Sequence, residues 1–189
     1  MKAFDRTLQR WRIGKIAPHL AAGGRVLDVG CADGALFRQL GDAVREGVGV
    51  DPDLPAEAKD GGRLRFVRGK FPDALSGERP FDSIAMLAIL EHMDEGELRG
   101  VADACRRLLR PGGRVVATVP SPLVDPILHV LAALRIIDGM ALHEHHEMDP
   151  RAILTAFEAA GMRLLVKRRF QLGLNNLYVF ENPPAAGGR

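Results

Sequence analysis

Short apolar runs alternate with stretches of helical periodicity along most of the chain. Such runs are typical of buried strands, and glycine, proline and aspartate mark where they stop. The pattern predicts strands near residues 25–30, 46–51, 64–69, 81–88, 113–119, 163–170 and 174–181, with helices between the first five. Strands that alternate with helices are typical of an α/β fold built on a parallel sheet. Only residues 171–173 separate the last two strands, and this is a hairpin-length connection.

Two of the expected helices have recognisable ends, and a third is recognised by its amphipathic pattern. One begins after Asp94, which forms a capping box with Glu97. Another has Pro150 at its first position and Gly161 as its terminator. The third is an amphipathic helix expected over residues 3–20. We expect it to lie against the sheet through its apolar positions, which are Trp11, Ile13, Ile16 and Leu20.

The first predicted strand ends in the most informative segment of the chain, Val-Leu-Asp-Val-Gly-Cys-Ala-Asp-Gly over residues 26–34. Gly30 and Gly34 lack Cβ atoms where the backbone turns sharply or passes close to a ligand, although close packing of a helix on a strand would need them as well. The next strand ends in Asp51, whose carboxylate can accept both hydroxyls of a ribose. A glycine turn followed by an acidic strand end predicts a site for an adenosine-containing cofactor.

The charges beside this turn distinguish between two cofactor classes. A dinucleotide turn carries a middle glycine where the pyrophosphate approaches, and this chain has Ala32 there instead. Asp28 and Asp33 place negative charge at the turn, which disfavours a pyrophosphate and favours a cation. S-adenosylmethionine carries a sulfonium and an ammonium and has no phosphate. The turn therefore predicts S-adenosylmethionine rather than a nicotinamide dinucleotide.

Two further motifs follow the glycine turn at suitable separations. They are Phe-Asp-Ser-Ile-Ala-Met-Leu-Ala-Ile-Leu-Glu-His over residues 81–92 and Leu-Arg-Pro-Gly-Gly over residues 109–113. With these three motifs in order, the chain resembles the class I S-adenosylmethionine-dependent methyltransferases, and in particular their small bacterial type 11-like group. The resemblance is strong over residues 26–119 and looser to about residue 182. It implies a three-layer, Rossmann-like, seven-stranded and mostly parallel sheet with an antiparallel C-terminal hairpin strand.

The resemblance also implies a set of cofactor-binding residues at the strand ends. The set comprises Asp28, Gly30, Cys31, Gly34, Asp51, Phe71, Leu87 and Ala88. Asp28 would pair with the cofactor ammonium, because a buried carboxylate without a partner is costly. Phe71 would pack on the adenine, although a hydrophobic plug explains it equally well. Leu87 and Ala88 would offer backbone carbonyls to the ammonium, or are only the end of a core strand.

One position departs from the resembled group. Its members usually carry an aspartate directly after the third strand, where it accepts a hydrogen bond from the adenine amino group. This chain has Lys70 there, and an ammonium has no acceptor. A backbone carbonyl or Asp73 must take this part, or adenine recognition is weaker.

Histidines supply the candidate catalytic groups. The segment His143–Glu147 holds three histidines and two glutamates, but it lacks the spacing of a known metal site, so we expect no metal. We expect this loop to lie near the transferred methyl group, where His145 or His146 would orient the acceptor or remove its proton. His92, after the fourth strand, is a third candidate, although it could instead tie the loop to the next helix. Transfer from a sulfonium depends mainly on positioning, so a base is optional.

Length and composition bear on the number of domains, the substrate class and the cellular location. The chain has 189 residues, and we expect one domain over residues 1–182 and a disordered tail over residues 183–189. A net charge of +2 predicts a small-molecule substrate rather than nucleic acid, and residues 167–169 (Lys-Arg-Arg) are more typical of a solvated strand end than of a phosphate-binding patch. Two cysteines and no signal peptide favour reduced thiols and a cytoplasmic location.

One segment and three rival functions stay open. Residues 123–137 are apolar nearly all round but too short to span a bilayer, and they suit a core helix, a lid over an apolar substrate or a dimer contact. Oligomeric state and acceptor do not follow from the sequence. The rivals are a nicotinamide-dependent oxidoreductase, a methyltransferase that acts on a macromolecule and a non-catalytic cofactor-binding protein.

Overall fold

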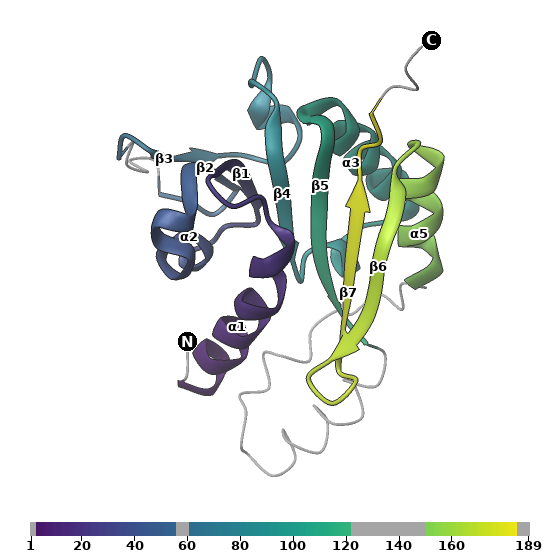
Figure 1. Ribbon diagram of the computed structural model, residues 1–189, viewed down its shortest axis with the longest axis horizontal. Helices are drawn as coiled ribbons and strands as arrows, with labels where there is room; N and C mark the ends of the chain where they lie inside the picture. Colours follow the sequence, from purple (N-terminus) through teal and green to yellow (C-terminus); the bar gives the residue numbers. More distant parts are fainter. Residues whose placement is uncertain (1–2, 56–60, 122–149, 185–189) are drawn as a thin grey trace.

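The computed structural model describes residues 3–55, 61–121 and 150–184. Figure 1 shows one sheet with helices packed on both of its faces. The strands are β1 (Gly24–Val29), β2 (Val44–Asp51), β3 (Leu64–Arg68), β4 (Phe81–Leu87), β5 (Leu109–Pro120), β6 (Arg163–Phe170) and β7 (Asn175–Glu181). The α-helices are α1 (Ala3–Ile16), α2 (Ala35–Leu40), α3 (Glu95–Leu108) and α5 (Pro150–Ala159).

The sheet has the expected topology. Its seven strands lie in the order β3-β2-β1-β4-β5-β7-β6. The pairings among β1 to β5 are parallel, whereas β7 runs antiparallel to both β5 and β6. Strand order reverses between β1 and β4, and open α/β sheets bind ligands beside the carboxyl ends of strands at such a reversal. The predicted fold class and the C-terminal hairpin are both confirmed.

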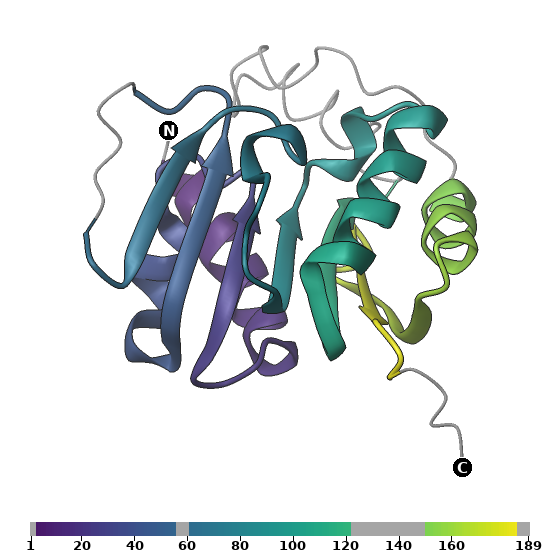
Figure 2. The same ribbon diagram turned by 90° about the horizontal axis from the view of Figure 1, so that it is seen from above.

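Two hydrophobic layers sandwich the sheet (Figure 2). On one face, α3 and α5 contribute apolar side chains to a core that is continuous with the strands, including Leu98, Ile153 and Phe157. On the other face, α1 and α2 do the same through Ile13, Ile16 and Phe37. Because β1 is buried along its whole length, its residues form a continuous apolar run broken only by Arg25 and Asp28.

The helix ends follow the capping chemistry of the sequence. Asp94 accepts the backbone N–H of Glu97 at 2.8 Å, and the Glu97 carboxylate accepts the N–H of Asp94 at 3.1 Å. Helix α5 begins at Pro150 and ends before Gly161, which has φ 77°. The N–H of Gly161 donates to the carbonyl of Glu158 and that of Met162 to the carbonyl of Phe157, which is the Schellman pattern.

Three expectations need correction. Helices do not fill every connection, because only a 3₁₀ turn over Asp73–Leu75 appears between β3 and β4 in the described residues. The helix expected over residues 3–20 stops at Ile16, where Pro18 leaves room only for a 3₁₀ turn. Trp11 does not pack on the sheet, since 45% of it is exposed. The apolar segment 123–137 lies outside the described residues.

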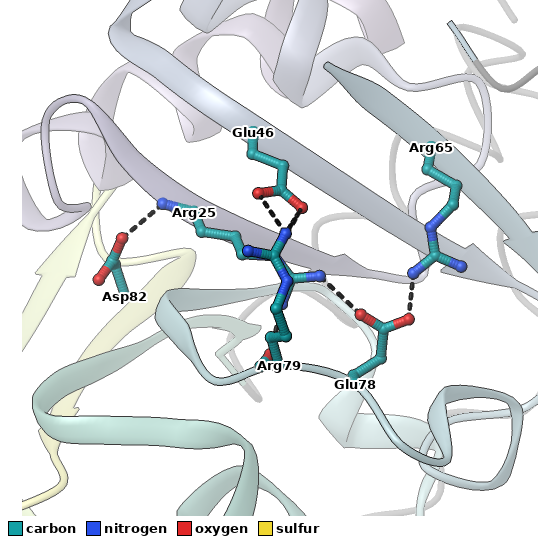
Figure 3. Close-up of polar contacts among 6 residues, drawn as sticks. All are labelled: Arg25, Glu46, Arg65, Glu78, Arg79 and Asp82. Carbon is teal, nitrogen blue, oxygen red and sulfur yellow. Dashed lines mark hydrogen bonds and ion pairs between the residues drawn. The ribbon is translucent and has the colours of Figure 1, made fainter. Parts of the chain in front are cut away.

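An ionic network fastens the amino ends of the strands (Figure 3). Arg25 of β1 donates to Glu46 of β2 at 2.8 Å and to Glu78 at 2.6 Å, and its guanidinium carbon lies 4.1 Å from the centre of the Phe81 ring. Arg65 and Arg79 bind the same two carboxylates from the other side. The bond from Arg25 lowers the pKa of Glu46, and the bonds from both arginines to Glu78 outweigh its burial and lower its pKa as well.

Candidate functional site

A cavity of about 720 Å³ opens at the carboxyl ends of β1, β2 and β3 and beside the segment that follows β4. This is the edge at which α/β sheets of this kind bind ligands. Apolar side chains, including Val50, Ile89 and Val101, form much of its wall. The polar and turn residues on the wall are Gly30, Asp51, Asp53, Lys70, Asp73, His92 and Glu97.

The glycine turn after β1 has a left-handed backbone at three positions. Gly30 and Gly34 both have φ 72°, and Ala32 has φ 43°. A Cβ on Gly30 would lie 2.6 Å from a methyl carbon of Ile89, and one on Gly34 would lie 2.9 Å from the ring of Phe66. Both glycines are therefore required by backbone conformation and by packing within the chain. Gly30 also lines the cavity, whereas Gly34 faces the β3 side of the turn.

Asp51, the last residue of β2, is held in place by the backbone around it. Its Oδ2 accepts the N–H of Ala32 at 2.9 Å, and its Oδ1 accepts the N–H of Asp53 at 2.9 Å. Each carboxylate oxygen keeps a further lone pair, and the residue lines the cavity. The geometry leaves a rigid carboxylate that can accept two neighbouring hydroxyl groups.

Asp28 lies beneath this turn and is only 3% exposed. Its burial, together with the charges of Asp51 and Asp33, raises its pKa to about 8. The thiol of Cys31 is also buried, and burial, with Asp28 and Asp51 nearby, raises its pKa to about 12. Both groups hold their protons at neutral pH in the free protein. A cation placed beside Asp28 would reverse that preference for the carboxyl group.

Asp33 is the one of the three carboxylates that has a cationic partner in the described part of the chain. It lies 2.5 Å from a guanidinium nitrogen of Arg38, and both side chains are more than half exposed. Solvent screens such a pair, so it changes the local field little. Asp51 therefore gives the turn an acidic group that has no cationic partner in the described residues, and Asp28 would add a second negative charge once it ionises.

The ends of β3 and β4 contribute unequally to the cavity. Phe71 and His92 line it, as do Lys70 and Asp73, which are both exposed. Leu87 instead packs in the core layer under α1. Ala88 has φ 55°, and its N–H donates to the carbonyl of Thr118 at 2.9 Å. The side chains of Leu87 and Ala88 do not line the cavity.

Comparison with known proteins is decisive for the family. A family model described as a methyltransferase domain matches residues 3–166. The chain belongs to the methyltransferase family.

Two relatives of the methyltransferase carry the same printed name, ubiquinone biosynthesis O-methyltransferase. The one from Xylella fastidiosa (strain 9a5c) is 32% identical over 158 residues, covering 76% of this chain and 62% of that protein. The one from Methylococcus capsulatus is 30% identical over 191 residues, covering 88% of this chain and 80% of that protein. The chain thus spans less than two thirds of the length of the Xylella relative.

A solved structure shows the same fold. The Burkholderia thailandensis 1,6-didemethyltoxoflavin-N1-methyltransferase, with bound 1,6-didemethyltoxoflavin and S-adenosylhomocysteine, aligns with a TM-score of 0.68. The two chains are 21% identical, and the alignment covers 92% of this chain and 77% of that chain. None of the described helices of the methyltransferase is long and apolar enough to cross a membrane.

Two polar residues of the methyltransferase escaped the sequence analysis. Glu91, in the 3₁₀ turn Leu90–His92 that follows β4, is 6% exposed, and its Oε2 has no hydrogen-bond partner among the described residues. Burial raises its pKa to about 7, although the charge of Arg12 on α1 acts in the opposite direction. The Nε of Arg12 is also buried and has no hydrogen bond within the described part of the chain. A glutamate that directly follows the apolar run of residues 84–90 was the signal that could have pointed to Glu91.

The remaining histidine candidates are not placed. His145 and His146 belong to residues 122–149, which lie outside the described part of the methyltransferase. Their catalytic role stays a prediction. His92 is the histidine candidate that the structure places at the cavity wall.

Proposed function

We propose that this methyltransferase binds S-adenosylmethionine in the 720 Å³ cavity and transfers its methyl group to a small-molecule acceptor. One observation carries the proposal: Asp51 presents an oriented carboxylate to the cavity while Asp28, buried close by, has no cationic partner in the described residues. The first group suits a ribose, and the second gains from a cation. A single ligand with a ribose and an ammonium would satisfy both.

The residues present fit such a cofactor. Asp51 would hold the ribose hydroxyls, and the apolar walls at Ile89 and Phe71 would take the base. Asp28 would face the ammonium, with its proton lost on binding because a neighbouring cation lowers the pKa of a carboxyl group. The left-handed turn at Gly30 lets the backbone approach the ligand. Gly34, Cys31, Leu87 and Ala88 support the turn and the strand end, and their cofactor contacts are part of the proposal.

When bound, the cofactor supplies a methyl group on a positively charged sulfur, which is already a good leaving group. The protein then has three tasks: to bind both reactants, to align the acceptor in line with the sulfur and to exclude water. His92 lies on the cavity wall and can orient an acceptor there. His145 and His146 are proposed for the same task.

A small acceptor is supported by the net charge of +2 and by the printed names of the relatives, which are O-methyltransferases of ubiquinone biosynthesis. Oxygen is therefore the acceptor atom to test first. A macromolecular acceptor is the alternative. A nicotinamide oxidoreductase is disfavoured because a pyrophosphate would be repelled by Asp51 and, unlike a cation, would oppose the ionisation of the buried Asp28.

The test begins with binding. Calorimetry should detect binding of S-adenosylhomocysteine and no binding of NADH. Small molecules released from the purified protein should include the cofactor or its product. Protein incubated with methyl-labelled S-adenosylmethionine and a panel of phenols, amines and RNA should then label a phenol or an amine. NADH binding without any response to S-adenosylhomocysteine would refute the cofactor. Cofactor binding with labelling of RNA alone would refute the small acceptor, and cofactor binding with no transfer to any class would favour the non-catalytic rival.

A further inference from the structure

A second hollow lies at the opposite edge of the sheet, where the parallel strands begin. Its volume is about 250 Å³, below the roughly 300–1,000 Å³ that is usual for drug-sized ligands. It is lined by His19 after α1, by Asp82 and Ser83 at the start of β4 and by Arg110 and Arg114 at the start of β5. Three of these five side chains are basic.

The single carboxylate in this hollow is already occupied on both sides. Oδ2 of Asp82 accepts the backbone N–H of Arg25 at 2.6 Å, and Oδ1 lies 2.5 Å from a guanidinium nitrogen of Arg110. Asp82 thereby neutralises Arg110. The side chain of Arg114 is half-buried in the same hollow and has no ion-pair or hydrogen-bond partner among the described residues. Glu181, the register partner of Arg114 on β7, is paired with Arg163 instead.

The pKa of His19 is affected by these basic groups. Burial lowers the pKa of this imidazole, and the charges of Arg114 and of Arg168 on β6 lower it further. Arg168 belongs to the basic run 167–169 that the sequence analysis favoured as a solvated strand end. All three residues of this run are exposed, as expected, and Arg168 lies close enough to act on His19, although it does not line the hollow. Within the hollow, basic groups from the turn at His19 and from β5 therefore lie around one carboxylate.

We infer that this hollow binds a compact tetrahedral oxyanion, of the kind carried by a phosphate monoester or by sulfate. The Arg114 guanidinium offers parallel N–H donors that match two oxygens of such a group, and among the described residues no carboxylate forms an ion pair with it. A protonated His19 would add a third donor. A bound dianion would offset the mutual repulsion of Arg114, Arg168 and His19. The site lies at the edge away from the proposed cofactor, so it does not depend on the proposed function.

The test uses inorganic sulfate at low ionic strength, because its charge stays constant between pH 6 and pH 8. Calorimetry on the full chain should show one sulfate site that binds more tightly at pH 6, where His19 is more often protonated. Arg114→Gln should weaken it at least tenfold. The control is Arg107→Gln, which makes the same charge change at an exposed position on α3, on the other face of the sheet, and should change the affinity less than twofold.

Further measurements keep the outcome clear. Arg114→Lys, which keeps the charge, should retain part of the affinity, and Arg114→Gln should melt near the parent chain in the absence of sulfate. In NMR spectra the His19 pKa should rise when sulfate or phosphate is added, and His19→Gln should remove the pH dependence of binding. An equal loss of sulfate affinity in Arg114→Gln and Arg107→Gln, or no saturable binding of sulfate or phosphate, would overturn the inference. Binding to anionic lipid vesicles without binding to sulfate or phosphate would show a diffuse surface patch and would overturn it as well.

Discussion

The two edges of the sheet treat charge in opposite ways. At the amino edge, Arg25 bridges Glu46 and Glu78, and the pKa of both glutamates is lowered. At the carboxyl edge, the pKa of Asp28 is raised to about 8 and that of Glu91 to about 7, since burial dominates there. Acidic side chains thus stabilise the fold at the amino edge of the sheet and cost stability at the carboxyl edge.

This contrast separates stability from function. A satisfied ionic network over β1, β2 and β3 holds the strands in place (Figure 3). Carboxylates buried without a cation cost stability, and such costs concentrate at sites where a ligand supplies the missing interaction. The four predictions below test this division, from the largest expected effect to the smallest.

Replacing Arg25 with Met should cost the most. The change strands two partly buried carboxylates that now share one guanidinium, so the free energy of unfolding should fall by about 3 kcal/mol. Urea unfolding is the measurement. The control is Arg63→Met, which breaks an exposed pair with Asp42 and should cost less than about 1 kcal/mol. Equal losses would show that the network does not differ from a surface ion pair.

Replacing Asp51 with Asn should affect binding rather than folding. The variant loses one charged acceptor in the cavity, so the affinity for S-adenosylhomocysteine should fall by about 1–3 kcal/mol in calorimetry. Asp103→Asn, an exposed change on α3 with the same charge difference, should leave that affinity unchanged. If Asp51→Asn binds as tightly as the parent chain, the ribose does not rest on this carboxylate.

Asp28 should give stability an unusual dependence on pH. Its folded pKa of about 8 lies above the ordinary aspartate pKa of 3.8, so between these values the folded state holds a proton that the unfolded state has released. The free energy of unfolding should therefore fall as pH rises from about 4 to about 8. Asp28→Asn lacks this titration, so its advantage in stability over the parent chain should be about 1–3 kcal/mol larger at pH 8 than at pH 5. Urea unfolding at both pH values measures this.

A residual slope in Asp28→Asn is expected from Glu91, whose pKa is also raised. The double variant with Glu91→Gln should be the flattest of the series. A parent chain that gains stability between pH 5 and pH 8 would contradict a buried, uncompensated Asp28.

Lys70→Asp should have the smallest effect. Lys70 is exposed on the cavity wall, and its carbonyl already accepts the N–H of Ala74 at 3.0 Å. Asp73, nearby on the same wall, can accept a hydrogen bond from the adenine amino group in its place. The variant should bind S-adenosylhomocysteine at least as tightly as the parent, whereas Asp73→Asn should bind a few-fold more weakly. A large loss in Lys70→Asp would reveal a positive role for this lysine.

Local chemistry explains which parts of the fold were predictable. The capping box at Asp94, the terminator at Gly161 and the hairpin after residue 170 each depend on neighbours in the sequence, and each is confirmed. The exposed Trp11 and the 3₁₀ turn between β3 and β4 depend on how distant segments pack. Periodicity cannot report such packing, because it says which side of a helix is apolar and not what covers it.

The site divides in the same way. Gly30 and Asp51 were recognisable because a strand end and a turn are local features, and both line one cavity. Glu91 and Arg12 are 79 positions apart in numbering, and only the docking of α1 over the end of β4 brings their charges together. The hollow around Arg114 was missed for the same reason, since its residues come from separate elements.

The position of β7 has a consequence for the order in which the protein can assemble. This strand is synthesised after β6, yet it lies between β6 and β5 and pairs with both. During synthesis β6 has no place in the sheet, and the edge of β5 stays open, until residues up to Glu181 have left the ribosome. Pairs such as Arg114 with Glu181 close a long stretch of chain, which slows folding. Strand β7 therefore completes the sheet, and a nascent chain that lacks it exposes a strand edge on which other chains can pair.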